Sequence, residues 1–343
     1  MHIPYNQPEQ RAIIQTLQEK AGQEWAAFHE DPALNAYLVI ERAMATELTR
    51  LAKRQLQTCA HAVLFEHTPE AHLAELSPWL IALPSRPEPA VLAPVYMAAQ
   101  LYGGMVWLWS ALDLPALAEH LRKFMGATLY NEATGEIEGD IALRSTDPRV
   151  LPGFIEALHP HQRDAFLQPI RACAIWNRHL QWQRWDGPAE PVTEPLPPLH
   201  ISLGQLGVMN RHTQPDKILH LLETEYGQQN DSPVHLHLLS QTQDARYRAV
   251  CACTETARRI GYENDQDLAL FASLTYLCHP RFSEAPRFRQ AMQDGIRNKI
   301  SLANTVIALP DAAWEEIDRM HATEFNAADS RPLHAPTLIE RHG

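Results

Sequence analysis

The residues best placed to do chemistry form a charged corner, Asp147-Pro148-Arg149, with Arg144 just before it. Asp147 could act as a general base, and His120 is the histidine that could work with it in a hydrolase. The triplet also has a structural explanation: Asp is a good helix N-cap, Pro is preferred at the first helical position, and the carboxylate complements the helix dipole. A third interpretation makes the corner a recognition point for a partner protein.

No motif of a known catalytic class supports the hydrolase interpretation. The sequence has no G-x-S-x-G, no phosphate-binding P-loop, no dinucleotide-binding fingerprint and no H-E-x-x-H. Its 14 glycines include no glycine-rich phosphate cradle. We therefore expect a protein that is not an enzyme and that uses no cofactor.

Eighteen histidines and five cysteines raise the question of a metal site. His235 and His237 would point to one side of a strand, but zinc needs three or four ligands. Cys251 and Cys253 are two residues apart on a predicted helix and would diverge. We expect no metal site. The odd number of thiols and their spacing indicate a reducing, cytoplasmic environment rather than a disulfide framework.

Aromatic and arginine side chains are the candidates for binding a protein. His120 and Arg122 lie late on a predicted helix, where cations are favourable in themselves. Trp107 and Trp109 would share one face of a predicted strand, and Trp79 follows a Ser-Pro turn. Arg and Trp dominate the binding energy of many interfaces. Packing in the core is the simpler role for most of the tryptophans.

The charge distribution disfavours two classes of partner. The net charge is −12, and neither half of the chain carries a basic excess. Nucleic acids and anionic membrane surfaces both require a concentrated positive patch. The N-terminus lacks the basic and apolar regions of a signal peptide. Residues 89–112 carry no charge, but proline, glutamine and a glycine pair interrupt them, which predicts a buried helix and strand rather than a membrane span.

Strands and helices alternate through the first half of the chain. The pattern predicts strands at 37–40, 62–65, 79–83, 105–110, 141–144 and 173–177, and helices at 7–28, 43–57, 69–76, 91–101, 114–125, 147–158 and 161–167. We therefore predict an α+β or α/β fold, in which an N-terminal lobe with a mixed sheet is flanked by helices.

The period becomes helical after a proline-rich stretch. Residues 186–199 contain five prolines, which favours a linker between domains. Helices are expected at 203–209, 215–226, 244–260, after Asn264, and at 311–322. We predict an α/β domain over 1–185, a linker over 186–199, a helical lobe over 200–309, and a terminal helix with a loose tail over 310–343.

Several short motifs occur in the order and spacing of a known family. They are Leu64–Glu70, Leu76–Leu80, Trp109-Ser110, His120–Arg122, Leu143-Arg144 and Asp147–Leu151. Together they resemble the adaptor chaperones of type VI secretion effectors (Tap- or TEC-like adaptor domains), over about residues 34–180. The segments ending at Gly261 and Cys278 resemble the helical lobe that often follows that domain.

The resemblance implies a cytoplasmic carrier of another protein. Such an adaptor binds one toxic effector, helps to load it onto the VgrG spike or its PAAR tip, and is not itself secreted. The candidate binding or motif residues are Glu66, Trp79, Trp109, His120, Arg122, Arg144, Asp147 and Arg149. We place the effector in a cleft between the two lobes. The alternatives are a hydrolase using Asp147 and His120, and an immunity-type protein that neutralises a toxin.

Overall fold

In a computed structural model of the chain, the described residues are 33–42, 59–83, 104–179, 181–188, 198–227 and 243–328, with the isolated residues 15, 19, 23, 31 and 241. They form two compact units, 1–213 and 214–343. The predicted helices 43–57 and 91–101, nearly all of the predicted helix 7–28, most of the predicted linker and the end of the chain lie outside the described residues.

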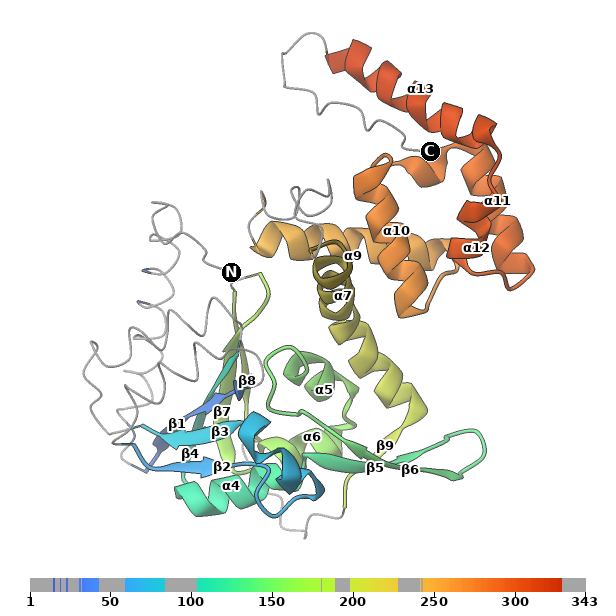
Figure 1. Cartoon of the computed structure of the whole chain (residues 1–343). Coiled ribbons are helices and arrows are strands. Elements are labelled where there is room, and N and C mark those ends of the chain that lie inside the picture. Colours follow the sequence, from blue (N-terminus) through green and yellow to red (C-terminus); the bar gives the residue numbers. More distant parts are fainter. Residues whose placement is uncertain are drawn as a thin grey trace. The chain divides into compact units, whose positions relative to one another are not determined.

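The first unit is built on a six-stranded sheet (Figure 1). Its strands follow the order β2-β3-β1-β4-β7-β8, and all neighbouring pairs are antiparallel. The bounds are β1 Asn35–Ile40, β2 His61–Val63, β3 Trp79–Ala82, β4 Met105–Ser110, β7 Ile170–Trp176 and β8 Trp182–Asp186.

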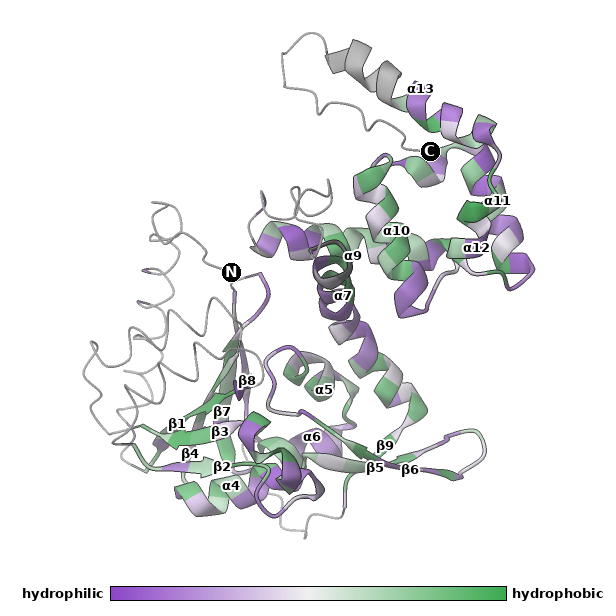
Figure 2. Cartoon of the chain, viewed as in Figure 1, coloured by the Kyte–Doolittle hydropathy of each residue, from purple (hydrophilic) through white to green (hydrophobic). Residues whose placement is uncertain are grey.

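Continuous apolar runs place β1 and β4 at the centre of this sheet. All of β4 and all but the first residue of β1 are buried, whereas β2 and β8 at the two edges are exposed or half-buried. A strand buried on both faces needs apolar residues at successive positions, because its side chains alternate between the faces. In Figure 2, the central strand β1 takes the hydrophobic green colour over most of its length.

Short helices cover the sheet and bury its apolar residues. Helix α4 (Leu114–Arg122) contacts β2 and β3, and α6 (Pro160–Leu167) contacts β7. Asp113 caps α4 by accepting a hydrogen bond from the amide of Ala116 at 2.9 Å. Helix α5 (Leu151–Ala157) contributes Phe154, whose ring packs edge-on against Phe166 with 5.2 Å between centroids. These aromatic contacts join the helices to one core.

A second, three-stranded sheet lies in the same unit, in the order β6-β5-β9. Strands β5 (Gly126–Tyr130) and β6 (Ile137–Ala142) form an antiparallel hairpin, and β9 (His200–Ser202) pairs with β5 in parallel. The sequence analysis missed β5 and placed the strand of β6 at 141–144. The reason is that most of β6 is exposed or half-buried and an irregularity interrupts its pairing, so no apolar run marks it.

Two further predictions of local structure are wrong. Cys173–Asn177 is not the last strand, because β8 and β9 follow it. Residues 203–209 and 215–226 are not two helices but one, α7 (Leu203–Gly227), with Pro215 inside it. A proline removes a backbone donor from the helix. Two residues before this proline, the Thr213 hydroxyl donates a hydrogen bond to the carbonyl of Asn210 at 3.3 Å.

The first unit continues beyond the predicted linker. Strand β9 joins the second sheet through β5, so residues after 199 share the fold of the residues before 186. The two units meet in sequence at Thr213 and Gln214, within α7. The structure therefore places the division after the proline-rich stretch and not at it.

The second unit is helical, as the sequence predicts. It contains α9 Gln243–Ile260, α10 Asp265–Leu277, η3 Phe282–Glu284, α11 Pro286–Arg297, α12 Leu302–Ile307 and α13 Asp311–Ala328. The predicted ends are confirmed: Gly261 follows α9 with a φ of 120°, and the Asn264 side chain accepts from the amide of Asp267 at 2.8 Å. A core around Phe271, Phe282 and Phe288 holds these helices together.

The predicted α+β fold class is confirmed, with sheets in the first unit and helices in the second. The mixed pairing occurs in the small sheet, whereas the large sheet is antiparallel. Within the uncharged stretch 89–112, residues 105–110 form β4. Of the helices in the described parts of the chain, none is long and apolar enough to cross a bilayer.

Candidate protein-binding surface

A short 3₁₀ helix, η2 (Pro69–Leu76), presents apolar side chains to solvent. Leu73 is 40% exposed and Leu76 is 50% exposed. Thr68 caps the helix, since its hydroxyl accepts from the amide of Glu70 at 3.2 Å, and a proline at the first position favours this start. Large apolar side chains exposed on one turn of helix are candidates for contact with another protein.

Ser77 fixes the end of η2 to the large sheet. Its buried hydroxyl accepts from the amide of Phe65 at 2.8 Å and donates to the carbonyl of Pro78 at 3.1 Å. Residues preceding proline favour extended backbone, and Ser77 has φ −62° and ψ 139°. The helix is therefore held at both ends while its leucines face outward.

Arg122 and Glu66 lie beside the start of η2. The Arg122 guanidinium donates to the carbonyls of Val63 at 2.9 Å and Leu64 at 3.2 Å, and its Nη2 lies 3.8 Å from Glu66. Its side chain is mostly buried, so its main work is to satisfy backbone carbonyls at the end of β2. A hollow of about 290 Å³ opens here, with Lys123 among its lining residues.

Trp79 lies at the other end of η2, under an arginine. The Arg42 guanidinium carbon sits 4.4 Å from the centre of the Trp79 ring, and Arg42 Nη1 donates to the carbonyl of Ala74 at 3.1 Å. Such a cation–π contact is worth about 0.5–1 kcal/mol at an exposed site. Burial lowers the pKa of Arg42. The half-buried Trp79 and Arg42 are of the types that dominate binding energy.

We call the residues Arg42, Glu66, Leu73, Leu76, Trp79 and Arg122 the η2 surface. Sequence reasoning selected Glu66, Trp79 and Arg122 of this group and missed the rest. Glu41 and Arg42 follow the buried strand β1, and this charged pair at the end of an apolar run is the sequence signal for Arg42.

The charged corner forms a buried network of two carboxylates and two arginines. Both Asp147 and Glu41 have fully buried side chains, and Arg144 pairs with Glu41 while its Nε lies 3.8 Å from Asp147. Arg149 donates to Asp147 through Nε at 2.9 Å and Nη2 at 2.5 Å. The helix predicted over 147–158 begins later, at Leu151, as α5. The side chain of Asp147 does cap the turn that leads into it, since Oδ1 accepts from the amide of Arg149 at 2.9 Å and the Asp147 carbonyl accepts from the amide of Leu151 at 2.8 Å.

The pKa values of the two carboxyls in this network are shifted in opposite directions. Burial, followed by the charge of Asp147, raises the pKa of Glu41 to about 7. Burial alone would raise the pKa of Asp147, but hydrogen bonds and the charge of Arg149 lower it below its ordinary value. Glu41 is therefore the member of the network that holds a proton near neutrality. Glu41 is not among the candidate residues predicted from the sequence.

Trp109 and His120 are core residues. Trp109 is buried and stacks on Trp107 with 6.1 Å between ring centres. His120 Nε2 lies 2.8 Å from the carbonyl oxygen of Phe166, and since a carbonyl only accepts, Nε2 carries the proton. Burial lowers the pKa of His120 to about 4. With Asp147 wholly buried and bound to Arg149, neither partner of the supposed hydrolase pair is open to a substrate.

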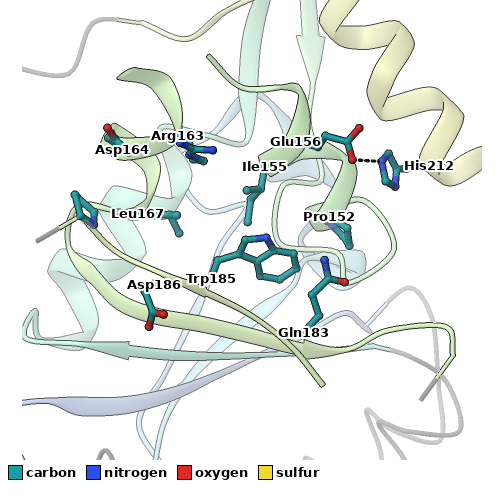
Figure 3. Close-up of a pocket in the computed structure, with 11 residues that line it drawn as sticks. Pro152, Ile155, Glu156, Arg163, Asp164, Leu167, Gln183, Trp185, Asp186 and His212 are labelled. Carbon is teal, nitrogen blue, oxygen red and sulfur yellow. Dashed lines mark hydrogen bonds and ion pairs between the residues drawn. The ribbon is translucent and has the colours of Figure 1, made fainter. Parts of the chain in front are cut away.

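A larger pocket of about 440 Å³ lies on the same unit, between α5, α6, β8 and the first half of α7 (Figure 3). Trp185 of β8 projects among its walls. At one side, His212 Nε2 lies 2.7 Å from Glu156 Oε2. Helices α5 and α7 approach closely here, since a Cβ on Gly153 would lie 2.7 Å from the Cβ of His212. None of the predicted site residues lines this pocket.

Metal ligands do not gather among the described residues: no group of three or more His, Cys, Asp or Glu side chains could hold an ion there. His235 and His237 lie outside this part of the chain. The five cysteines are free thiols, and burial raises the pKa of Cys251 and Cys253.

Comparison with known families gives a match that includes the η2 surface and the buried network. Residues 36–165 match the model of a family described as a domain of unknown function (DUF4123). This family is associated with adaptors of type VI secretion effectors. The match begins in β1 and ends in α6, so it contains the η2 surface and the buried network. No significant match was found among curated proteins or among solved structures.

Proposed function

We propose that this protein is a cytoplasmic adaptor that binds one type VI secretion effector and loads it onto the VgrG spike or its PAAR tip, without catalysing a reaction. The observation that carries the proposal is the family match, which spans the residues of the η2 surface. The motifs in the sequence that resemble effector adaptors fall within the matched residues or next to them.

The η2 surface suits contact with a protein. Two leucines are exposed on a helix that is tethered at both ends, and Trp79 and Arg42 lie beside them. A pre-ordered apolar surface loses little entropy on binding. The alternatives are weaker: the hydrolase would depend on a buried Asp147, and an immunity protein has no specific support in the described residues.

The test is capture of the partner from the native host. Tagged full-length protein is expected to recover one effector, with or without a spike protein, in stoichiometric amount. Deletion of the gene should stop secretion of that effector and leave secretion of other effectors intact. Recovery of the protein alone, while the secretion genes are expressed, would overturn the proposal.

The same strain separates an adaptor from an immunity protein. Loss of an immunity protein would make the cell sensitive to the toxin, with secretion unchanged. Loss of an adaptor would abolish delivery of the toxin, with the producing cell unharmed. A double Asp147→Asn, His120→Gln variant that folds but loses a measured turnover would instead favour the hydrolase.

A further inference from the structure

The pocket beside α5 and α6 combines an aromatic floor with an acidic rim. Figure 3 shows the Trp185 indole in the middle of the site, with Ile155 and Leu167 near it. Three carboxylates line the same pocket from three elements: Glu156 on α5, Asp164 on α6 and Asp186 on β8. Apolar side chains next to more acidic than basic lining residues suit a ligand with an apolar body and a positive end.

The pairing of these carboxylates leaves one of them available. Glu156 is bound by His212, and Asp186 lies 2.5 Å from Arg184 Nη2. Asp164 is half-exposed, and its carboxylate makes no hydrogen bond or ion pair with any residue that the structure describes. A carboxylate without a partner can form a charge-assisted hydrogen bond with a cation that enters the pocket.

One lining base opposes this charge. Arg163 is exposed and likewise has no ion pair within the described residues. It is the only lysine or arginine that lines the pocket among the residues described, against three acids. Because Arg163 is positively charged, it would repel a basic occupant and attract an acidic one, so a change at this position distinguishes the two.

We propose that this pocket receives an arginine or lysine side chain of the bound effector, an inference that rests on the proposed function. The aliphatic stem lies in the pocket against its apolar residues Ile155, Leu167 and Trp185, and the charged end reaches the carboxylate of Asp164 on the pocket wall.

The pocket lies partly inside and partly outside the residues of the family match, which suits a site that recognises one particular partner. Its walls on α5 and the first part of α6 lie within the family match, whereas Trp185 and His212 lie beyond residue 165. Here, side chains outside the matched domain complete a site that begins within it.

The first experiment compares full-length variants for affinity to the captured effector. Asp164→Asn is expected to weaken binding by about five- to tenfold, because it removes the available charge. Arg163→Gln is expected to leave binding unchanged or tighten it a few-fold. If Arg163→Gln weakens binding and Asp164→Asn does not, the occupant is acidic and the proposal is overturned. Both positions are open to solvent, so neither change should unfold the chain.

A second experiment reads the pocket without the effector. The indole ¹⁵N–H signal of Trp185, assigned with Trp185→Phe, is followed while acetyl-Gly-Arg-Gly-amide or acetyl-Gly-Glu-Gly-amide is added to the full chain. The arginine peptide should shift this signal, and should not do so in Asp164→Asn. A shift with the glutamate peptide alone, or with neither peptide, contradicts the proposal. A shift with the arginine peptide in a protein that captures no effector supports the pocket while refuting the adaptor.

Discussion

At the scale of single residues, two buried groups give the first unit opposite responses to pH. Glu41 holds its proton up to a pKa of about 7, above the ordinary value of 4.5. His120 stays neutral down to about 4, below the ordinary value of 6.5. The free energy of unfolding changes with pH according to the difference in bound protons between the unfolded and folded states. Glu41 therefore makes the free energy of unfolding fall as the pH rises, and His120 makes it fall as the pH drops.

For Glu41, the folded state keeps a proton that the unfolded state loses. Its contribution to stability is complete below pH 4.5 and is lost as the pH rises to about 7. Glu41→Gln should remove this loss, which is on the order of 3 kcal/mol for a fully buried group. Chemical unfolding at several pH values, followed by tryptophan fluorescence, checks the prediction; parallel profiles for the two proteins would contradict it.

For His120, the unfolded state binds a proton as the pH falls below 6.5, whereas the folded state does not bind it until about pH 4. Stability is complete above pH 6.5 and is lost as the pH falls towards 4. His120→Gln keeps a donor for the Phe166 carbonyl and removes the titration, so the variant should resist acid better, by up to about 3 kcal/mol at pH 4. Seven of the eight tryptophans lie in residues 1–213, so a Trp314→Phe background restricts the fluorescence signal to the first unit. Equal losses in acid would refute this role.

At the scale of elements, η2 is held by its ends while its leucines remain free for contact. Leu73→Asp with Leu76→Asp should leave the unfolding midpoint almost unchanged and weaken effector binding by at least about tenfold. Ile137→Asp is the matched control, because Ile137 is 71% exposed on β6, outside the η2 surface. Equal losses of affinity in the two proteins would show that η2 is not the binding element.

The end of β8 approaches the α6–β7 turn through a glycine. A Cβ at Gly187 would overlap the backbone carbonyl oxygens of Ile170 and Leu167, which cannot rotate away. Gly187→Ala should therefore destabilise the first unit by about 1–3 kcal/mol. In Gly126→Ala the nearest atom lies 3.8 Å away, so that control should change stability by no more than about 0.5 kcal/mol. Denaturant midpoints of the two variants provide the comparison.

At the scale of the whole molecule, each unit has its own core. Phe154 belongs to the core of the first unit and Phe288 to the core of the second, and both are fully buried. Phe154→Ala should lower the stability of the first unit by about 3–5 kcal/mol, and Phe288→Ala should do the same in the second. Trp314 packs on Phe288 with 5.1 Å between ring centres and reports the second unit. A single transition shifted equally by both variants would contradict independent units.

The sequence by itself determined the elements whose signals are local. The apolar runs of β1 and β4, the glycine after α9 and the Asn264 cap predict the observed structure, because periodicity and caps act over a few neighbouring residues. The motifs that resemble effector adaptors fall within the range of the family match or next to it.

Only the tertiary structure decided which predicted residues act together. Glu41 and Arg144 are far apart in the chain yet meet in one buried network, and Glu66 meets Arg122 at the end of β2. The strands β5, β8 and β9 were missed because their own sequences carry no apolar run: most residues of β5 and β8 are exposed or half-buried, and β9 is only three residues long. The exposure of the η2 leucines and the pocket over Trp185 likewise depend on how distant segments pack, which no local pattern in the sequence records.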